Sequence, residues 1–359
     1  MTIDLLRPPP LLTAELPGIG GRIKDVPEDF EVEEIPAYEP SGTGDFLYLW
    51  IEKRDMGAEF FTRHLARRLD IPVREVGIAG MKDRRAVTRQ MVSIPASAAA
   101  RIDELNGDGV RVLSVQRHSN KLRTGHLHGN RFRILVRDAA APERLEPIVQ
   151  RLQQEGLPNF YGPQRFGRDG ETLHWGLALL RKEPAPLSPN GRRPNLKNPF
   201  LRKLTLSAAQ AALFNAYLAA RLHDGLLRQV LNGDLMAKWP FGGMFVGTDR
   251  DREQARFDAR ETVHTGPIFG RKMYPAAGDA AAREAATLAD AGLTVRSFDG
   301  FGKLLAGTRR HNLVYVDDLT FAADAAGIQL KFTLPAGSYA TILLRELTKT
   351  EFSSREDAE

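Results

Sequence analysis

Apolar and polar residues follow two different spacings along the chain, which together predict a mixture of strands and helices. Residues 46–51 (FLYLWI) are continuously apolar, as in a strand that is buried on both faces. Residues 57–69 place apolar side chains at helical spacing. By the same reasoning, further strands are expected over residues 76–79, 87–94, 312–316 and 329–334, and further helices over residues 145–152, 207–222, 276–292 and 338–347.

The ends of the chain differ in texture from its middle. Residues 1–22 are rich in Pro and Gly and predict a loose lead-in, and the polar tail 351–359 predicts disorder. Residues 207–210 (SAAQ) predict a capping box at the start of an Ala-rich helix. Because strands dominate both ends and helices the middle, we expect one domain to be inserted into another.

Length and composition narrow the class of protein. At 359 residues the chain is long enough for two domains, and 42% hydrophobic with 26% charged residues is typical of a soluble globular protein. The absence of cysteine excludes disulfides, thiolate catalysis and cysteine-based zinc sites. No signal peptide or membrane-spanning stretch is recognisable, so we expect a cytoplasmic protein without a membrane partner.

The turn inside residues 77–90 (GIAGMKDRRAVTRQ) holds the first candidate for chemistry. Asp83 is its only acid and stands next to Lys82, Arg84 and Arg85. Neighbouring cations favour the ionised form of a carboxylate, and the glycines allow a ligand to approach the backbone. The pattern also fits a solvated turn whose charges neutralise one another, because such clusters are common on protein surfaces.

The whole chain has a formal net charge of +5, and residues 111–137 are its most basic stretch. This stretch contains no acid, which indicates a surface that follows phosphates. Within it, Phe132 alternates with Arg131 and Arg133, so a strand would separate the aromatic ring from the arginines. Phe132 could therefore stack on a base or simply belong to the core. The seven cations are Arg111, Arg117, Lys121, Arg123, Arg131, Arg133 and Arg137.

Three other features have weaker patterns. His126 and His128 could share one strand face, but a metal site usually needs three or four ligands, so no metal is expected. Residues 158–167 (PNFYGPQRFG) could line a site or form a packed interdomain turn. Arg345 lies among apolar residues of a predicted helix, and a cation in that position usually has a partner.

Several stretches, taken in order, resemble the TruD family of tRNA pseudouridine synthases. The matching pieces span residues 23 to about 350. They are residues 27–30 (PEDF), 79–90 (AGMKDRRAVTRQ), 129–132 (GNRF), 158–167 (PNFYGPQRFG), 207–222 with 213–215 (LFN), 334–341 (LPAGSYAT) and 345–347 (REL). Met81 and Pro163 depart slightly from the family pattern.

The resemblance implies an α+β fold with a V shape. Residues 1–158 and 308–359 would form the pseudouridine synthase catalytic domain, a mixed and mainly antiparallel sheet with flanking helices. Residues 159–307 would form an inserted α/β domain. In related synthases a late basic residue pairs with the catalytic aspartate, so a contact between Arg345 and Asp83 is predicted.

The resemblance also assigns the reaction and its residues. Asp83 falls on the catalytic aspartate of an enzyme that isomerises uridine, in bacterial members at position 13 in the D arm of tRNA. No cofactor is required, and a monomer is expected. Arg345 joins Asp83 as a catalytic residue. The candidate substrate-binding and RNA-binding residues are Phe30, Lys24, Lys82, Asn130, Phe132, Lys121, Arg123, Gln164 and Arg165.

Two other functions remain open from the residues alone. A non-catalytic RNA-binding or RNA-remodelling protein could use the same basic surface without chemistry at Asp83. A glycoside hydrolase would normally need two carboxylates about 5–10 Å apart, whereas residues 77–90 offer one carboxylate among cations.

Overall fold

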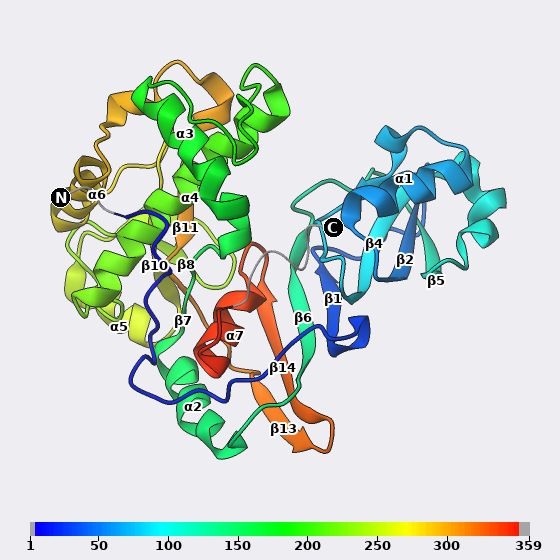
Figure 1. The fold of residues 1–359 in the computed structure, drawn as a ribbon, viewed down its shortest axis with the longest axis horizontal. Coiled ribbons are helices and arrows are strands. Elements are labelled where there is room, and N and C mark those ends of the chain that lie inside the picture. The colour runs from blue at the N-terminus through cyan, green and yellow to red at the C-terminus, as the bar shows by residue number, and fades with distance from the viewer. Residues whose placement is uncertain (1–3, 352–359) are drawn as a thin grey trace.

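A computed structural model describes residues 4–351 and shows one large mixed sheet with a smaller sheet beside it (Figure 1). The large sheet has eight strands in the order β13-β14-β6-β1-β4-β2-β5, with β3 added alongside β4. Only β1 and β4 run parallel, and the other pairs are antiparallel. Its strands are β1 (Phe30–Pro36), β2 (Phe46–Arg54), β3 (Gly77–Ile78), β4 (Val87–Pro95), β5 (Val110–His118), β6 (Leu127–Val136), β13 (Thr320–Asp324) and β14 (Gly327–Pro335).

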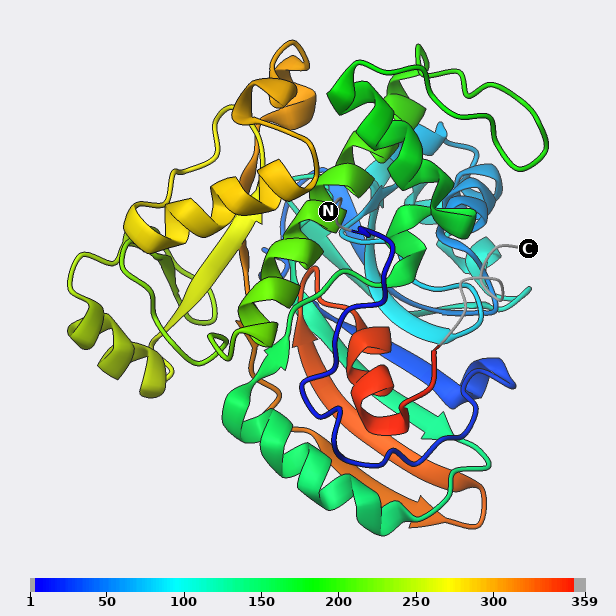
Figure 2. The same ribbon diagram turned by 60° about the vertical axis from the view of Figure 1, so that its left-hand side comes forward.

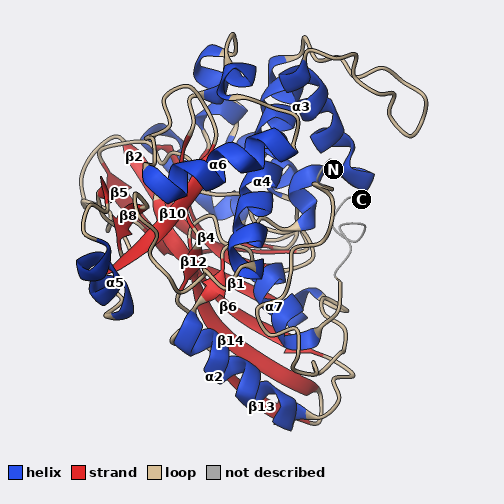
Figure 3. Ribbon diagram, turned by 90° about the vertical axis from the view of Figure 1, so that its left-hand side faces the viewer, coloured by secondary structure: helices blue, strands red, loops and turns tan. Residues whose placement is uncertain are grey.

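The smaller sheet and most helices come from the middle of the chain and gather on one side of the molecule (Figure 1), the side that faces the viewer in Figure 3. The smaller sheet has the order β11-β10-β8-β9, built from β8 (Leu235–Lys238), β9 (Met244–Val246), β10 (Thr262–Ile268) and β11 (Thr308–His311). A third pairing joins β7 (Leu157–Pro158) to β12 (Leu313–Val314). The helices are α1 (Ala58–Leu69), α2 (Leu145–Glu155), α3 (Glu171–Arg181), α4 (Pro199–His223), α5 (Arg250–Asp258), α6 (Gly278–Asp290) and α7 (Ala340–Thr348).

Two apolar clusters cover opposite ends of one face of the large sheet. Helices α2 and α7 pack on β6 and β14 (Figure 2), where Ile134 and Leu330 are fully buried. Helix α1 packs on β2 and β4 in a separate cluster around Leu49 and Phe61. Between the clusters, β1, β2 and β4 carry buried polar side chains on the same face, because residues two apart on a strand point the same way. These side chains are Glu34, Lys53, Thr88 and Gln90, which we call the polar strip.

The α+β fold class with a mainly antiparallel mixed sheet is confirmed. The division at residues 158/159 and 307/308 stays a prediction. The apolar cluster beneath α2 and α7 crosses that boundary, since it includes Phe214 and Leu218 of α4 as well as Val263 of β10. The packing between the two parts is therefore continuous rather than a thin contact.

The prediction of a loose lead-in over residues 1–22 is wrong for the described part. Residues 12–20 pass across α7 (Figure 2), with Thr13 and Ile19 buried. The carboxylate of Glu346 accepts hydrogen bonds from the backbone of Leu12 at 2.7 Å and of Thr13 at 3.1 Å. Pro and Gly mark irregular backbone, but irregular backbone can still be packed. Of the predicted tail, only Glu351 lies within the described residues.

The predicted capping box at Ser207 is also wrong, because α4 begins eight residues earlier. Asn198 caps it, and its side chain accepts hydrogen bonds from the backbone N–H groups of Phe200 and Leu201. Pro199 occupies the first helical position, where its missing N–H leaves no hydrogen bond unmade. The predicted strand over residues 312–316 is reduced to the two residues of β12.

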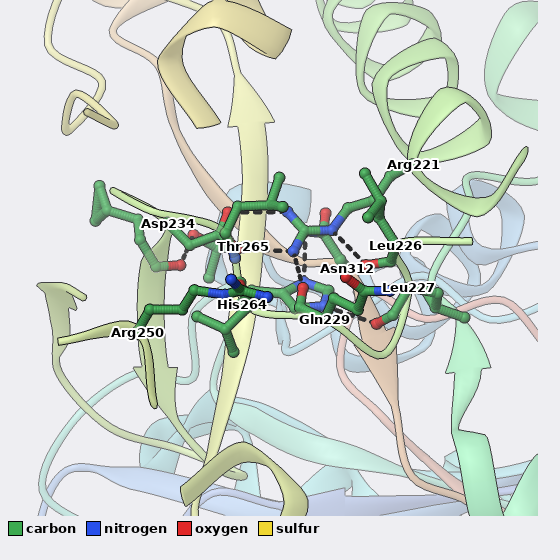
Figure 4. Close-up of polar contacts among 12 residues, drawn as sticks. Arg221, Leu226, Leu227, Gln229, Asp234, Arg250, His264, Thr265 and Asn312 are labelled. Atoms are coloured by element: carbon green, nitrogen blue, oxygen red, sulfur yellow. Dashed lines mark hydrogen bonds and ion pairs between the residues drawn. The ribbon is translucent and has the colours of Figure 1, made fainter. Parts of the chain in front are cut away.

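A buried ion pair ties α4 to the smaller sheet (Figure 4). The guanidinium of Arg221 donates to both carboxylate oxygens of Asp234, at 2.8 and 2.7 Å, and both side chains are buried. It also donates to the carbonyls of Leu226 and Gln229, so the segment after α4 wraps around it. Beside this pair, burial lowers the pKa of His264 to about 3, so the imidazole is neutral at pH 7.

Asp234→Ala should destabilise the protein by about 3–5 kcal/mol, since it leaves a buried guanidinium without its counter-charge. Urea unfolding at pH 7 measures this change. The matched control is Asp258→Ala, which removes an exposed carboxylate 3.2 Å from Arg228 and should change the free energy of unfolding by about 1 kcal/mol or less. Equal effects of the two substitutions would contradict the assigned importance of the buried pair.

Candidate active site

Asp83 lies in the loop between β3 and β4, at the margin of the polar strip. Its carboxylate is about one-third exposed, at 36%, and it accepts a hydrogen bond and ion pair from the ammonium of Lys24 at 2.9 Å. Lys24, by contrast, is almost completely buried, at 4% exposure. The arrangement presents an ionisable carboxylate to solvent while its cationic partner is held inside the protein.

Lys24 is held in an unusual backbone conformation. Its φ angle is +61°, in the left-handed region that residues other than Gly seldom adopt. Its ammonium lies 4.5 Å from the ring centroid of Phe30, which favours the cation through the ring quadrupole. Backbone strain of this kind persists where surrounding contacts enforce it, and it is frequent at functional sites. Lys24 and Phe30, two predicted site residues, are thus brought together with Asp83.

Lys53, which was not among the predicted site residues, holds the backbone of the loop that carries Asp83 from the protein interior. Its ammonium is fully buried and donates to the carbonyl of Asp83 at 3.0 Å and to that of Met56 at 2.5 Å. Burial lowers the pKa of Lys53 from 10.5 to about 8, although the nearby charges of Asp83 and Asp55 act to raise it. The alternation of residues along β2 could have predicted its burial, because Lys53 continues the inward-facing series Leu47, Leu49 and Ile51.

Lys82, a predicted RNA-binding residue, forms an ion pair inside the fold. Its ammonium is buried and lies 2.5 Å from the carboxylate of Glu34 on β1. The other oxygen of Glu34 accepts the backbone N–H of Met91 on β4 at 3.2 Å. This buried pair joins the loop to two strands, so Lys82 positions the loop in this structure.

Phe132 and Asn130 lie on β6, on the face of the sheet that carries the polar strip. Phe132 is partly buried, stacks on Phe332 at 5.1 Å between ring centroids and meets Phe30 edge-on at 6.2 Å. Asn130 pairs in register with Glu34. Its Oδ1 is buried and has no hydrogen-bond partner among residues 4–351, and the same holds for Oγ1 of Thr88. Unpaired buried polar atoms are rare and call for an explanation.

The acid-free stretch 111–137 is less free than its sequence suggests. The strand faces predicted around Phe132 are correct, but the outward arginines meet acids of neighbouring segments. The pairs are Arg111 with Glu52, Arg131 with Glu33, Arg133 with Glu31 and Arg137 with Asp29. The prediction of an unneutralised basic surface is therefore wrong for these four cations, because acids distant in sequence lie beside them.

Two further pairs of predicted RNA-binding residues lie on segments other than the loop that holds Asp83. Lys121, which donates to the carbonyl of Arg74, and the exposed Arg123 line a cavity of about 500 Å³ with Tyr38 and His118. Gln164 and Arg165 lie in a short 3-10 turn, Pro163–Phe166, at the start of the middle part of the chain. The RNA-binding role of both pairs stays a prediction.

The predicted contact between Arg345 and Asp83 is wrong. Arg345 donates to the carboxylate of Glu351 and to the carbonyl of Pro9, both at 2.5 Å. It lines a cavity of about 900 Å³ between α4 and the N-terminal segment. Helix α7 directs Arg345 to the side on which that segment lies. The reasoning that a cation among apolar residues has a partner was sound, but the partner is local, and Lys24 takes the place beside Asp83.

The site offers no ready place for a metal. Among the described residues 4–351, no group of three or more His, Asp or Glu side chains is arranged to hold an ion. His126 bonds through Nδ1 to the hydroxyl of Tyr38 at 2.6 Å, and His128 stacks on Phe241. Within the same range, no helix is both long and apolar enough to cross a membrane.

Asp83 thus presents a partly exposed carboxylate, paired with the buried ammonium of Lys24, beside a mixed sheet, and such a group can act as a nucleophile or a general base. Comparison with known proteins gives the family. A family model described as tRNA pseudouridine synthase D (TruD) matches residues 10–186 and 196–347. The chain belongs to the tRNA pseudouridine synthase D (TruD) family.

Individual relatives cover nearly the whole chain. A tRNA pseudouridine synthase D from Anaeromyxobacter sp. (strain Fw109-5) is 44% identical over 95% of this chain and 96% of its own length. A protein of the same name from Thermus thermophilus is 40% identical over 98% of this chain and 95% of its own length. A crystal structure from Methanosarcina mazei assigned to the same family superposes with a TM-score of 0.76 at 25% identity, covering 96% of this chain and 97% of that one.

The buried ammonium of Lys53 predicts a specific dependence of stability on pH. Between about pH 8 and pH 10.5 the unfolded chain binds a proton at Lys53 that the folded chain lacks, so the free energy of unfolding should increase with pH. Lys53→Met should remove up to about 1.4 kcal/mol per pH unit of that increase.

Urea unfolding of wild type and variant across this window gives the measurement. The exposed Lys331→Met is the control and should keep the wild-type slope. If Lys53→Met and wild type showed the same dependence, Lys53 would not be carrying its charge in a buried environment.

Proposed function

We propose that this protein is a tRNA pseudouridine synthase that isomerises a uridine at position 13, in the D arm, with Asp83 as the catalytic carboxylate. The observation that carries the proposal is the partly exposed carboxylate of Asp83, paired with Lys24 at 2.9 Å and anchored through its backbone by Lys53. The named relatives act on tRNA as pseudouridine synthases by name, which supports the same substrate here.

The reaction sets the requirements for the site. The bond from N1 of uracil to C1′ of the ribose breaks, the base turns, and a bond from C5 to C1′ forms. C5 loses its proton and N1 ends protonated, so no electron, water or cofactor is consumed. Asp83 serves either as nucleophile at C1′ or as base at C2′, and both roles require the ionised carboxylate. The ammonium of Lys24 donates a hydrogen bond to this carboxylate and would orient it for either role.

The target base must leave its stack to reach Asp83. Phe132, on the same sheet face, would pack against the extruded base, as its half-buried ring allows. Oδ1 of Asn130 would accept a hydrogen bond from the base or the ribose. The substrate would then supply the donor that this buried oxygen lacks among residues 4–351. Phe30 and Lys24 would form the wall beside the carboxylate.

The rest of the RNA would lie across both parts of the chain. Residues 159–307 would form an inserted domain, whose Gln164 and Arg165 would contact the RNA. Lys121 and Arg123 would contact the RNA from the other part of the chain. Each phosphate contact by Lys or Arg should add about 0.7–0.9 to the salt dependence of log K.

Asp83→Asn should abolish pseudouridine formation while leaving RNA affinity within a few-fold, because the amide is nearly isosteric but is neither nucleophile nor base. The measurement is release of tritium from tRNA labelled at uridine C5. A non-catalytic RNA-binding protein and a glycoside hydrolase would both release none in the wild type. Full activity of Asp83→Asn would remove Asp83 from the chemistry.

Arg345→Ala tests whether Arg345 takes part in the reaction although it does not contact Asp83. Because Arg345 bonds to Glu351 and Pro9 rather than Asp83, the variant should convert tRNA within about twofold of the wild-type single-turnover rate, well under the 1.4 kcal/mol of a tenfold change. A loss comparable to that of Asp83→Asn would show that Arg345 reaches the reacting groups when RNA is bound.

A further inference from the structure

A cluster of arginines and tyrosines lies where the end of β14 meets the segment that follows β7. The guanidinium carbon of Arg310, on β11, is 4.2 Å from the ring centroid of Tyr161. That of Arg165 is 5.6 Å from the same centroid, so one ring contacts both guanidiniums. Tyr339 packs edge-on against Tyr161 at 5.7 Å.

Arg310 uses only part of its hydrogen-bonding capacity. Its Nε donates to the carbonyl of Asn159 at 3.0 Å, and Nη2 donates to Oδ1 of the same residue at 2.7 Å. Oδ1 also accepts the hydroxyl of Ser338 at 3.0 Å, so Asn159 is fixed. Nη1 of Arg310 faces the exposed Gly337, where a Cβ would lie only 3.3 Å away. The absence of a side chain at Gly337 leaves room for a further acceptor at Nη1, beside the hydrogen bond between Arg310 and Tyr161.

Arg165 is similarly underused. Its Nη2 donates to the hydroxyl of Ser207 in α4. Its Nε is buried and has no hydrogen-bond partner among the described residues. A guanidinium carries five N–H donors, so most of those on Arg165 remain for another acceptor.

Neither of these half-buried arginines has a carboxylate within ion-pair distance in the range 4–351, in contrast to two fully buried arginines of this protein. Arg309, the chain neighbour of Arg310, is paired with Glu284, and Arg221 is paired with Asp234. Burial lowers the pKa of Arg310, and the positive charge of Arg165 acts in the same direction. Two like charges brought together without a counter-ion raise the free energy of the folded state, and a bound anion would remove that penalty.

The cluster lies beside the proposed site. Leu334 of β14 pairs in register with Asn130, and the backbone N–H of Ala336 donates to the carbonyl of His128 at 2.9 Å. The turn from β14 to α7 therefore starts next to Asn130 and ends at Tyr339, within the cluster. Ala336 and Gly337 in that turn and Pro163 in the segment after β7 are exposed, so solvent reaches this region.

We propose that Arg165 and Arg310 together bind a phosphate group of the RNA backbone close to the target uridine. The phosphate would accept hydrogen bonds from Nη1 of Arg310 and from the unpaired donors of Arg165, the charge-assisted contacts for which guanidinium groups are suited. The Tyr161 ring holds both guanidiniums in place. This inference rests on the proposed function, because the RNA supplies the phosphate.

A set of tRNAs, each with one neutral methylphosphonate linkage near the target uridine, tests the assignment by filter binding. One linkage should weaken binding to the wild type by about tenfold or more, as expected for hydrogen bonds to a charged group. Arg165→Gln and Arg310→Lys should bind unmodified tRNA about tenfold more weakly, and the same linkage should cause them little further loss. The salt slope of Arg165→Gln, which loses a charge, should fall by about 0.7–0.9.

The control is Arg283→Gln, which removes the same charge from an exposed pair with Asp224 and should keep the wild-type linkage profile. Arg310→Lys could disturb Asn159, so Arg165→Gln decides the matter if that variant unfolds at a lower temperature. The inference is overturned if no linkage affects the wild type or if the variants keep its profile. A third outcome would also overturn it. If inorganic phosphate protects the wild type but not Arg165→Gln against heat, while both proteins show the same sensitivity to methylphosphonate linkages, the arginines bind a small anion and not the RNA backbone.

Tritium release by the wild type at saturating tRNA separates this inference from the proposed function. Release without a sensitive linkage contradicts the phosphate site and leaves the synthase assignment standing. If one linkage weakens binding to the wild type but not to Arg165→Gln, and the wild type releases no tritium, the phosphate site is supported and the proposed catalysis is contradicted.

Discussion

The ammonium of Lys53 is the contact on which the candidate site depends. A lysine buried between apolar clusters needs oxygen partners, and here these are the backbone carbonyls of Met56 and Asp83. Because those carbonyls belong to two different loops, one ammonium holds the end of β2 and the loop before β4 together. The side chain of Asp83 then points toward Lys24, whose own position is fixed by burial and by the ring of Phe30. The carboxylate is thus oriented by rigid elements of the sheet.

The two faces of the large sheet have different electrostatic tasks. On one face, the ammonium of Lys53 contacts backbone carbonyls and that of Lys82 contacts the carboxylate of Glu34. Oγ1 of Thr88 and Oδ1 of Asn130, on the same face, have no hydrogen-bond partner among residues 4–351. On the other face, arginines of β5 and β6 meet glutamates of β1 and β2 in exposed pairs, each worth about 0–1 kcal/mol. The large number of cations therefore overstates the basic surface available to RNA. Cations that have no acid within ion-pair distance among residues 4–351, such as Arg165 and Arg310, are the better candidates for contacts with phosphate.

Much of the fold followed from local patterns, and most of the site depended on contacts that local patterns do not contain. Strand alternation separated Phe132 from Arg131 and Arg133, and the lone acid in residues 77–90 identified Asp83. The predicted partner of Asp83 was wrong, because Lys24 and Arg345 are both far from it in sequence and only tertiary packing chooses between them. Lys53 was missed since a lysine at the end of a strand is usually exposed. The start of α4 was misplaced because Ser207 imitates a cap that Asn198 already supplies.

The most direct test of the role of Asp83 is a crystal structure with tRNA that carries 5-fluorouridine at the target position. We expect the fluorinated base to be extruded into the polar strip and packed against Phe132, with a carboxylate oxygen of Asp83 at the ribose C1′ or C2′ within about 3.5 Å. Lys24 should still contact that carboxylate. A target nucleotide bound elsewhere, with Asp83 facing only solvent or protein, would contradict the assignment of this carboxylate to the reaction.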